Sequence, residues 1–458
     1  MNLIHELRIT ELAHNGAGIG FIPGAGRGKA VFVPGALPGQ VVSARPVKDS
    51  KNWLAAQLVA VTCEPDNLAE PICGHASECG GCPWQRLPYE RQLFFRQRLA
   101  QQALARIGGM VWDDILRAWQ PARPAPLLRN FRNKLELAFG RDRSGNLALG
   151  FRSRASHAVC GVSDCALLDE AGRGLVDAAV EFAKAARLAP AYWRHLVLRR
   201  SRGLADPSLR WHCLLITRPD RKARRVAAAL GERLLARQAG SFVHEERTSS
   251  SQLARGERRV LCLDRAGREN AAAAILALEL GGRLFEFDAA SFFQVNDLAA
   301  QELAACLPYS GESGPLLDLF CGSGAPGQLL SGRHAAGLGL ELDSRAVAMA
   351  RRNAGRNGLS GWRYRAGPAL RALGELKRGK WPAVLLDPPR QGVGSEAMAR
   401  LLALEPREIT YISCDPATLA RDAGMLGPEW RLDSLRPVDM FPHTPHLECI
   451  AHWRRKAG

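Results

Sequence analysis

The chain has 458 residues, more than one typical hydrophobic core accommodates, so we expect two or three domains. Although 47% of the residues are hydrophobic, no apolar run reaches membrane-spanning length, and the first residues lack an apolar signal-peptide core. We therefore expect a cytoplasmic chain with no membrane partner. The sequence does not determine the oligomeric state, and a monomer is the working expectation. The 62 Lys and Arg against 45 Asp and Glu give a formal net charge of +17, which favours a polyanionic partner such as RNA. An Arg-rich genomic composition would produce the same bias.

Residues 1–62 are predicted to be all-β. The runs LRITELAHNGAGIGFI, KAVFVPGALPGQVVSARPV and WLAAQLVAVT are short strand-like segments between Gly- and Pro-rich turns. About five such strands indicate a small barrel, which is a common platform for nucleic acids. The segment also resembles the TRAM domain, an OB-like barrel of RNA-modifying enzymes, and this resemblance implies RNA binding.

Residues 63–285 have a mixed pattern. The run YERQLFFRQRLAQQALARI, residues 89–107, has helical apolar spacing and meets no breaker before Gly108. Strand-like segments such as RNKLELAFG and WHCLLIT alternate with helix-like segments such as RKARRVAAALGERLLARQ. We therefore expect an α+β central domain.

The central region contains a cluster of cysteines. Three of the chain's twelve cysteines, Cys73, Cys79 and Cys82, lie in CGHASECGGC, where glycines allow the chain to fold around one centre. Disulfides are not expected in a cytoplasmic chain. A fourth thiolate would complete a site for zinc or an iron–sulfur cluster, and spacing alone does not distinguish the two. Cys160 and Cys165 are the candidates for the fourth ligand.

Residues 286–458 alternate between strand-like and helix-like segments. PLLDLF, AAGLGLEL, AVLLDPP and EITYISC are typical of strands, and each precedes a helical pattern. WRLDSLRPVDMF and HLECIAHWRR then form a hairpin-like pair. Alternating βα units predict a parallel sheet with right-handed crossovers, so the expected class is a Rossmann-like α/β domain.

A glycine loop follows the first of these strands. In LLDLFCGSGAPG, Asp318 lies near the strand end, and two glycines in the turn allow a ligand to approach the backbone. Glu341 ends the next strand, about twenty residues on, where it can accept both hydroxyls of a ribose. The G-x-G-x-x-G spacing also fits a dinucleotide site. DLFCGSG followed by LLDPPR resembles motifs of class I S-adenosylmethionine methyltransferases, and this resemblance implies that cofactor.

Cys414 ends the strand-like run YISC. A lone cysteine is usually a packing residue, but the carboxyl edge of an open α/β sheet is where ligands bind. LLDPPR lacks the aromatic residue typical of base-amine methyltransferases and the cysteine typical of RNA cytosine-C5 enzymes. A single thiol suits uracil C5, because a thiolate added at C6 makes C5 nucleophilic. A base must then remove the C5 proton, and the candidates are His443, His446 and Glu448.

Five segments together resemble the RNA (uracil-C5)-methyltransferase family: SFFQVN, DLFCGSG, LDPPRQG, SCDPATLARD and FPHTPHLE. With the TRAM-like start and the cysteine cluster, the resemblance covers nearly the whole chain and is closest to the TRAM-containing, iron–sulfur 23S ribosomal RNA members. It implies C5-methylation of one uridine, in 23S rRNA, through a covalent cysteine–C6 adduct.

The same resemblance implies roles for individual residues. The implied nucleophile is Cys414, and the implied base is Glu448. The implied cofactor contacts are Gln294, Phe320, Glu341 and Asp387. The implied ligands of a [4Fe–4S] cluster are Cys73, Cys79, Cys82 and Cys165.

Three sites, with five residues in all, depart from the family pattern. Ala325-Pro326 replace an Asn and an aromatic residue, Gly367-Pro368 occupy the place of an Asn or Asp near the adenine, and Asp415 replaces an Asn after Cys414. An adjacent carboxylate disfavours a thiolate. Two alternatives therefore stay open: the same reaction on transfer RNA, or a non-catalytic RNA-binding protein that retains the methyltransferase fold.

Other polar residues receive simpler interpretations. Arg390 and the cluster FRNK, residues 131–134, are candidate phosphate contacts. His443 and His446 are interpreted as structural residues of their loop, and Cys321 and Cys449 as packing residues.

Overall fold

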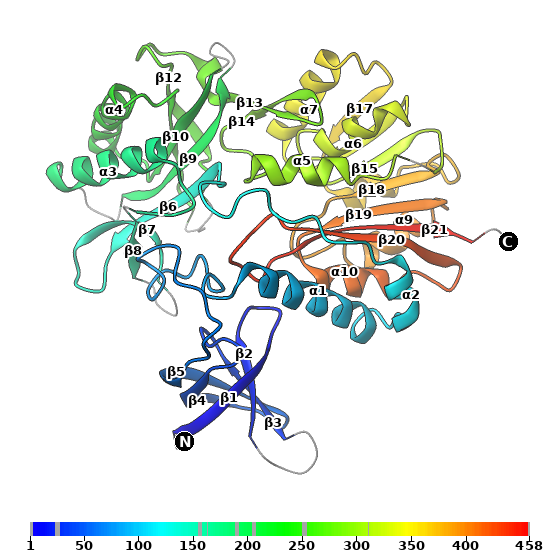
Figure 1. Ribbon diagram of the computed structural model, residues 1–458. Coiled ribbons are helices and arrows are strands. Elements are labelled where there is room, and N and C mark those ends of the chain that lie inside the picture. Colours follow the sequence, from blue (N-terminus) through cyan, green and yellow to red (C-terminus); the bar gives the residue numbers. More distant parts are fainter. Residues whose placement is uncertain are drawn as a thin grey trace.

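The computed structural model describes residues 3–22, 28–153, 158–162, 164–187, 192–203, 208–249, 254–309 and 311–456. They form a small barrel, a central sheet and a C-terminal sheet flanked by helices, in that order along the chain (Figure 1). The barrel, in dark blue, lies at one end of the molecule, and the other two regions lie side by side. Among the described helices, none is long and apolar enough to cross a membrane.

The N-terminal region is a closed five-stranded barrel, as predicted. Its strands are β1 (Ile4–Leu12), β2 (Gly18–Ile22), β3 (Lys29–Val33), β4 (Val41–Asp49) and β5 (Trp53–Cys63). They pair in the order β1-β2-β3-β5-β4. Alternate side chains such as Leu7, Ile9 and Val31 are buried in the barrel, since successive strand residues face opposite sides. Gly18 is required here, because a Cβ would lie 2.7 Å from the carbonyl oxygen of Ala36.

Two helices follow the barrel: α1 (Tyr89–Arg106) and α2 (Trp112–Ala118). Helix α1 confirms the helix predicted for residues 89–107. It packs into the same core as the C-terminal sheet and lies beside the later helix α10 (Pro416–Ala423) (Figure 1). A fully buried ion pair joins the helix to that region, because Arg96 Nη1 and Asp439 Oδ1 are 2.6 Å apart. The barrel is thus connected to the rest of the molecule through a helix anchored on the C-terminal core.

The central region is a mixed sheet of nine described strands with two helices. The strands are β6 (Lys134–Arg141), β7 (Leu147–Arg152), β8 (Val159–Gly161), β9 (Trp193–Gly203), β10 (Leu209–Thr217), β11 (Phe242–Glu246), β12 (Arg258–Leu263), β13 (Ile275–Leu280) and β14 (Arg283–Asp288). The helical elements are α3 (Glu170–Ala185), α4 (Arg221–Ala236) and the short η1 (Ala271–Ala274). The main path is β12-β11-β10-β9-β6-β7-β8, and β13 pairs with both β9 and β14.

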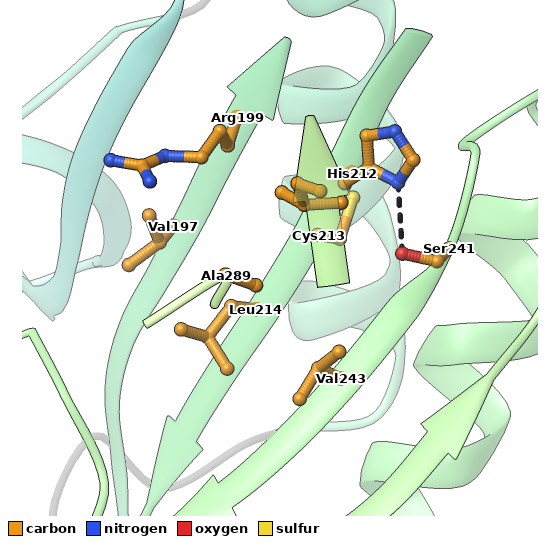
Figure 2. A pocket seen from close by; sticks show the side chains of 9 residues that line it. Val197, Arg199, His212, Cys213, Leu214, Ser241, Val243 and Ala289 are labelled. Carbon is orange, nitrogen blue, oxygen red and sulfur yellow. Dashed lines mark hydrogen bonds between the residues drawn. The ribbon is translucent and has the colours of Figure 1, made fainter. Parts of the chain in front are cut away.

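The central sheet encloses a narrow pocket (Figure 2). Its lining is mainly apolar, but it includes His212, whose Nδ1 lies 2.9 Å from the hydroxyl of Ser241. Arg199 also lines it and is only 3% exposed. No residue of the C-terminal sheet lines this pocket, so it lies apart from the glycine loop and from Cys414.

The C-terminal region is a seven-stranded sheet with the order β17-β16-β15-β18-β19-β21-β20 among the described residues. Its strands are β15 (Leu316–Leu319), β16 (Gly337–Glu341), β17 (Trp362–Ala366), β18 (Ala383–Leu386), β19 (Glu408–Ser413), β20 (Trp430–Val438) and β21 (Glu448–Arg455). The remaining helical elements are α5 (Asp297–Ala305), α6 (Ala325–Leu329), η2 (Leu330–Gly332), α7 (Ser344–Arg356), α8 (Ala369–Leu373) and α9 (Ser395–Leu402).

Strands β15 to β19 are parallel, and every residue of β15 and β18 is buried. Parallel strands covered by helices on both faces have this burial pattern, and it confirms the predicted α/β class. The predicted hairpin is confirmed as the antiparallel pair β20–β21. The strand order reverses between β15 and β18, and in open α/β sheets ligands bind at the carboxyl ends of the strands beside such a reversal.

Candidate active site

The glycine loop lies at the carboxyl end of β15, where the strand order reverses. Phe320 follows the strand with a φ of 63°, a left-handed conformation that aromatic residues rarely adopt. Its N–H donates to the carbonyl of Leu340 at 2.8 Å, which holds the loop against β16. Gly322 and Gly324 have φ values of 53° and 83°, and α6 begins directly after them. The turn therefore brings backbone N–H groups to the strand edge, as the sequence predicts for a cofactor loop.

Glu341 ends β16 and faces this loop. Its Oε2 accepts the N–H of Gly322 at 3.1 Å, and its Oε1 accepts the N–H of Asp343 at 2.8 Å. Each carboxylate oxygen has two lone pairs, so each retains one for a further donor. The carboxylate is thus held in one orientation with the capacity to accept two ligand hydroxyls.

Three acidic side chains gather at the ends of β15, β16 and β18. Burial, the neighbouring Asp387 and then Glu341 raise the pKa of Asp318 well above its usual range. Burial and Glu341 raise the pKa of Asp387 to about 7. Among the described residues, neither oxygen of Asp318 meets a donor in hydrogen-bonding geometry, although Gly327 approaches closely. Such a buried acidic group suits a cationic ligand such as the sulfonium and ammonium groups of S-adenosylmethionine.

Cys414 and Glu448 face each other across two antiparallel strands. The register of β19 and β21 pairs Ile412 with Ile450 and Ser413 with Cys449. Cys414 and Glu448 are the next pair in this register, which explains how residues 34 positions apart meet. Burial and then Glu448 raise the pKa of Cys414 to about 12. Burial and then Asp387 raise the pKa of Glu448 to about 8.

Arg390 lies beside this pair and acts against both shifts. Its charge lowers the pKa of Cys414 and the pKa of Glu448, each of which is raised by burial and nearby carboxylates. Its Nη2 donates to Nε2 of His446 at 3.2 Å. Since a guanidinium only donates, His446 must accept at this nitrogen, and burial followed by Arg390 lowers the pKa of His446 to about 4. His446 is therefore a neutral support for Arg390.

Asp415, the position that departs from the family after Cys414, caps helix α10. Its side chain accepts the N–H of Ala417 at 2.9 Å, which is an ordinary N-cap contact. The carboxylate also adds to the raised pKa of Cys414, but burial, Glu448 and Asp387 contribute more. The departure therefore has a local structural function and a small electrostatic effect.

Gln294 lies in a segment that the central sheet holds in place. The side-chain amide of Asn133 donates to the carbonyl of Gln294 at 3.0 Å, and the N–H of Asn133 donates to Val295 at 2.9 Å. Arg199 Nη1 donates to the carbonyl of Ser291 at 3.0 Å. The helix cap in this segment is Asn296, whose side chain accepts the N–H of Ala299, so Gln294 is not the cap. Two buried residues of the central sheet thus fix the backbone on either side of Gln294.

The phosphate contacts predicted at residues 131–134 stay a prediction, because Arg132 and Lys134 are only partly exposed. Phe131 and Asn133 are buried, and Lys134 pairs with Glu136. Arg132 donates from Nε to the carbonyl of Lys134. Asn133 also joins this cluster to the segment of Gln294.

The loop histidines and the other two cysteines have structural positions, as predicted. His443 is buried, its Nε2 lies 2.9 Å from the carbonyl oxygen of Leu128, and its N–H donates to Gln92. Cys321 and Cys449 are both buried, and burial raises the pKa of each thiol. Neither thiol is accessible to a substrate, whereas Cys414 is partly exposed.

The cysteine cluster is gathered in one part of the central region. Burial, then Cys165, then Cys79 raise the pKa of Cys82 to about 12, and Cys73 contributes in the same direction. Cys79, Cys82 and Cys165 pack against one apolar core, together with Cys160. Within the described ranges, however, no group of three or more His, Cys, Asp or Glu side chains is arranged to hold a metal ion. The four predicted ligands are neighbours, and the metal stays a prediction.

Comparisons with known proteins agree with this geometry. Residues 369–456 match the family model for tRNA (uracil-5-)-methyltransferase, and residues 4–59 match the TRAM domain. An RNA methyltransferase of Nitratidesulfovibrio vulgaris, described as uncharacterized, is 34% identical over 444 residues, which cover 92% of this chain and 91% of the relative. The chain belongs to the RNA (uracil-5-)-methyltransferase family. A further relative from Clostridium acetobutylicum is 29% identical and covers 99% of this chain and 98% of its own length.

The fold is also shared with a solved structure. The tRNA (uracil-54, C5)-methyltransferase of Pyrococcus abyssi, in complex with S-adenosyl-L-homocysteine, superposes with a TM-score of 0.74. It is 24% identical in sequence and covers 98% of this chain and 99% of its own. The protein is thus an RNA uracil-5 methyltransferase of the S-adenosylmethionine-dependent class I fold with an N-terminal TRAM domain, which confirms the predicted family and enzyme class.

Proposed function

We propose that this methyltransferase acts through a covalent adduct between Cys414 and C6 of its target uracil. The observation that carries the proposal is the register of β19 and β21, which ends at Ser413 and Cys449 and so brings the adjacent Cys414 and Glu448 together beside Asp387. A nucleophile and a proton acceptor are thereby presented to the same side of one base.

Each step has a residue that suits it. The Cys414 thiolate adds to C6, and the C5–C6 π electrons move toward C5 and O4, forming an enolate. C5 then attacks the electrophilic methyl group, which S-adenosylmethionine supplies on a sulfonium that leaves as a neutral thioether. Glu448 takes the C5 proton, the C5–C6 double bond re-forms, and the C6–S bond breaks to release Cys414.

The cofactor is held, in this proposal, by Gln294, Phe320, Glu341 and Asp387. Glu341 supports the ribose because its carboxylate is already oriented by two backbone N–H groups. Asp318 is fully buried beside Asp387, so it contributes negative charge behind Asp387 and does not itself contact the cofactor. The strained backbone of Phe320 supports a functional position for its ring.

The proposed substrate is a uridine of 23S rRNA. The TRAM barrel and the cysteine cluster support this choice through the family resemblance. Transfer RNA is the second candidate, because the structural neighbour from Pyrococcus abyssi acts on tRNA. In either RNA the base must leave its stack before Cys414 can reach C6.

We further propose that Cys73, Cys79, Cys82 and Cys165 hold a [4Fe–4S] cluster. Their proximity in one apolar part of the central region supports the proposal. Methyl transfer from a sulfonium needs no electron, so the cluster would organise the loop that contains Cys73, Cys79 and Cys82.

Three further expectations stay predictions. They are the domain bounds 1–62, 63–285 and 286–458, the monomeric state and the cytoplasmic location.

The test uses RNA that contains 5-fluorouridine, which cannot lose its C5 substituent as a proton. The protein is incubated with S-adenosylmethionine and fluorinated 23S rRNA fragments or tRNA, and adducts are mapped by mass spectrometry. We expect a methylated adduct on Cys414 that is absent in Cys414→Ala and retained in the control Cys306→Ser, a half-buried cysteine outside the site. Adducts with only one RNA class identify the substrate. Binding of RNA without any adduct would favour the non-catalytic alternative.

A further inference from the structure

Helix α7, which follows Glu341, is clamped at its N-terminus by the central region. The guanidinium of Arg255 donates twice to Asp343, from Nη1 to Oδ2 at 2.7 Å and from Nη2 to Oδ1 at 2.9 Å. The hydroxyl of Ser291 also donates to Asp343 Oδ2, at 3.2 Å. A bidentate pair fixes the position and the plane of a carboxylate, which a single contact does not.

Asp343 in turn orients Glu341. It is the N-cap of α7, and its Oδ1 accepts the N–H of Arg345 at 3.0 Å. Its own backbone N–H donates to Oε1 of Glu341 at 2.8 Å. The contacts therefore run from a guanidinium of the central region, through one aspartate, to the carboxylate beside the cofactor loop.

The segment that contains Arg255 is itself fixed. Gly256 donates its N–H to Glu245 Oε2 at 2.9 Å, and a Cβ at Gly256 would lie 2.2 Å from the Cβ of Glu245. Arg345 bridges the two regions, because its Nη1 donates to Glu245 Oε1 at 2.9 Å and its Nη2 to the carbonyl of Gly256 at 3.3 Å. The residue that follows Arg255 is therefore held by Glu245 of β11 and by Arg345 of α7, which fixes the chain beside the guanidinium.

We propose that Arg255 is a positioning residue for cofactor binding, acting on Glu341 through Asp343. The inference rests on the proposed contact between Glu341 and the cofactor. If Arg255 is removed, Asp343 retains its cap contact but loses its bidentate partner, and the N–H that orients Glu341 is less firmly placed. In the native protein, by this proposal, Arg255 of the central region completes the cofactor site of the C-terminal sheet.

The first experiment uses the full-length chain and compares the native protein with Arg255→Ala, Arg255→Lys and Asp343→Asn. We expect the KM for S-adenosylmethionine and the Kd for S-adenosylhomocysteine to rise roughly tenfold in Arg255→Ala, with kcat at saturating cofactor within about twofold. Arg255→Lys keeps the charge and loses the bidentate geometry, so it should restore part of the affinity. Asp343→Asn keeps the backbone N–H and loses the ion pair, so it should resemble Arg255→Ala.

Arg258→Ala is the matched control. Arg258 lies in the same segment but pairs with Glu246, away from Asp343, so its loss should leave the cofactor Kd unchanged. A fall in kcat and in thermal stability with an unchanged cofactor Kd in Arg255→Ala would overturn the inference, because it would indicate a purely structural role. Glu341→Gln separates the two proposals. If Glu341→Gln weakens S-adenosylhomocysteine binding and Arg255→Ala does not, only the positioning role fails; if Glu341→Gln binds normally, the cofactor contact itself fails.

Discussion

Arg390 offers a sharp test of the electrostatics of the candidate site. It is the cation that favours the ionised forms of both Cys414 and Glu448. We predict that Arg390→Ala moves the rising limb of the pH–rate profile to higher pH. The reason is that both groups must lose a proton to act, and both lose it less readily without the guanidinium.

The magnitude follows from the pKa values. At pH 8, a thiol with a pKa of about 12 is ionised in about one molecule in ten thousand. An opposite charge nearby lowers a pKa by about one to three units, and we take about one unit because Arg390 is exposed. Removing it therefore lowers the thiolate fraction, and with it kcat/KM for RNA, about tenfold at pH 8. Glu448, with a pKa of about 8, would shift in the same direction.

The assay measures kcat/KM for RNA from pH 6.5 to about pH 10 for the native protein, Arg390→Ala and Arg390→Lys. Arg390→Lys retains the charge and should return most of the profile to its native position. Because the whole range lies below the pKa of Cys414, the thiolate fraction falls by the same factor at each pH, and the diagnostic feature is the inflection from Glu448 near pH 8, which should move to higher pH in Arg390→Ala. An inflection that stays in place, together with a shallower salt dependence of RNA binding, would refute the reasoning. That outcome would assign Arg390 to a phosphate contact, as the sequence first suggested.

Three other predictions concern separate parts of the molecule. Glu448→Gln should accumulate a methylated covalent adduct on ordinary uridine RNA and lose turnover by at least about a hundredfold, because the C5 proton has no acceptor; a fully active variant, measured by methyl transfer, would exclude Glu448 as the base. Asp439→Ala should lower the free energy of unfolding by about 3–5 kcal/mol in denaturant titrations, since it leaves Arg96 buried and unpaired, whereas Asp114→Ala at an exposed pair should change it by less than about 1 kcal/mol. Cys82→Ser should abolish bound iron and sulfide, measured after purification without oxygen. If the native protein purified in the same way contains no iron and no sulfide, the proposed cluster is contradicted.

The fold was predictable because its signals are local. The helix at residues 89–107 and the closing β-hairpin each have a periodicity that a short window reveals, and α1 and the pair β20–β21 agree with it. The barrel likewise follows from short strands between Gly and Pro turns. The sequence did not show that the cluster at residues 131–134 has structural contacts, because charge in a sequence does not reveal partners distant along the chain. Asn133 contacts the segment of Gln294, and Arg132 donates to the carbonyl of Lys134.

Some contacts of the site could not be predicted from the sequence, because they join residues that are far apart along the chain. Asp343 follows Glu341 as an ordinary helix cap, and Arg255 lies 88 positions before it, so no local pattern connects them. Asp318 was visible as a strand-end carboxylate, but its proximity to Asp387 depends on the order of strands in the sheet. The family resemblance supplied Cys414 and Glu448 without explaining why they meet.

The sheet topology supplies that explanation. In a purely parallel sheet, the carboxyl ends of all strands lie at the same edge. Only residues that follow a strand in sequence could then contribute to a site at that edge. Because β21 is antiparallel and lies between β19 and β20, its first residue starts at the edge where β19 ends. Glu448 therefore reaches Cys414 from the opposite chain direction, and its side chain is buried beside Asp387. The antiparallel strand β21 thus places a carboxyl of raised pKa, that of Glu448, beside the thiol of Cys414. Removal of the C5 proton requires this arrangement of a base next to the nucleophile.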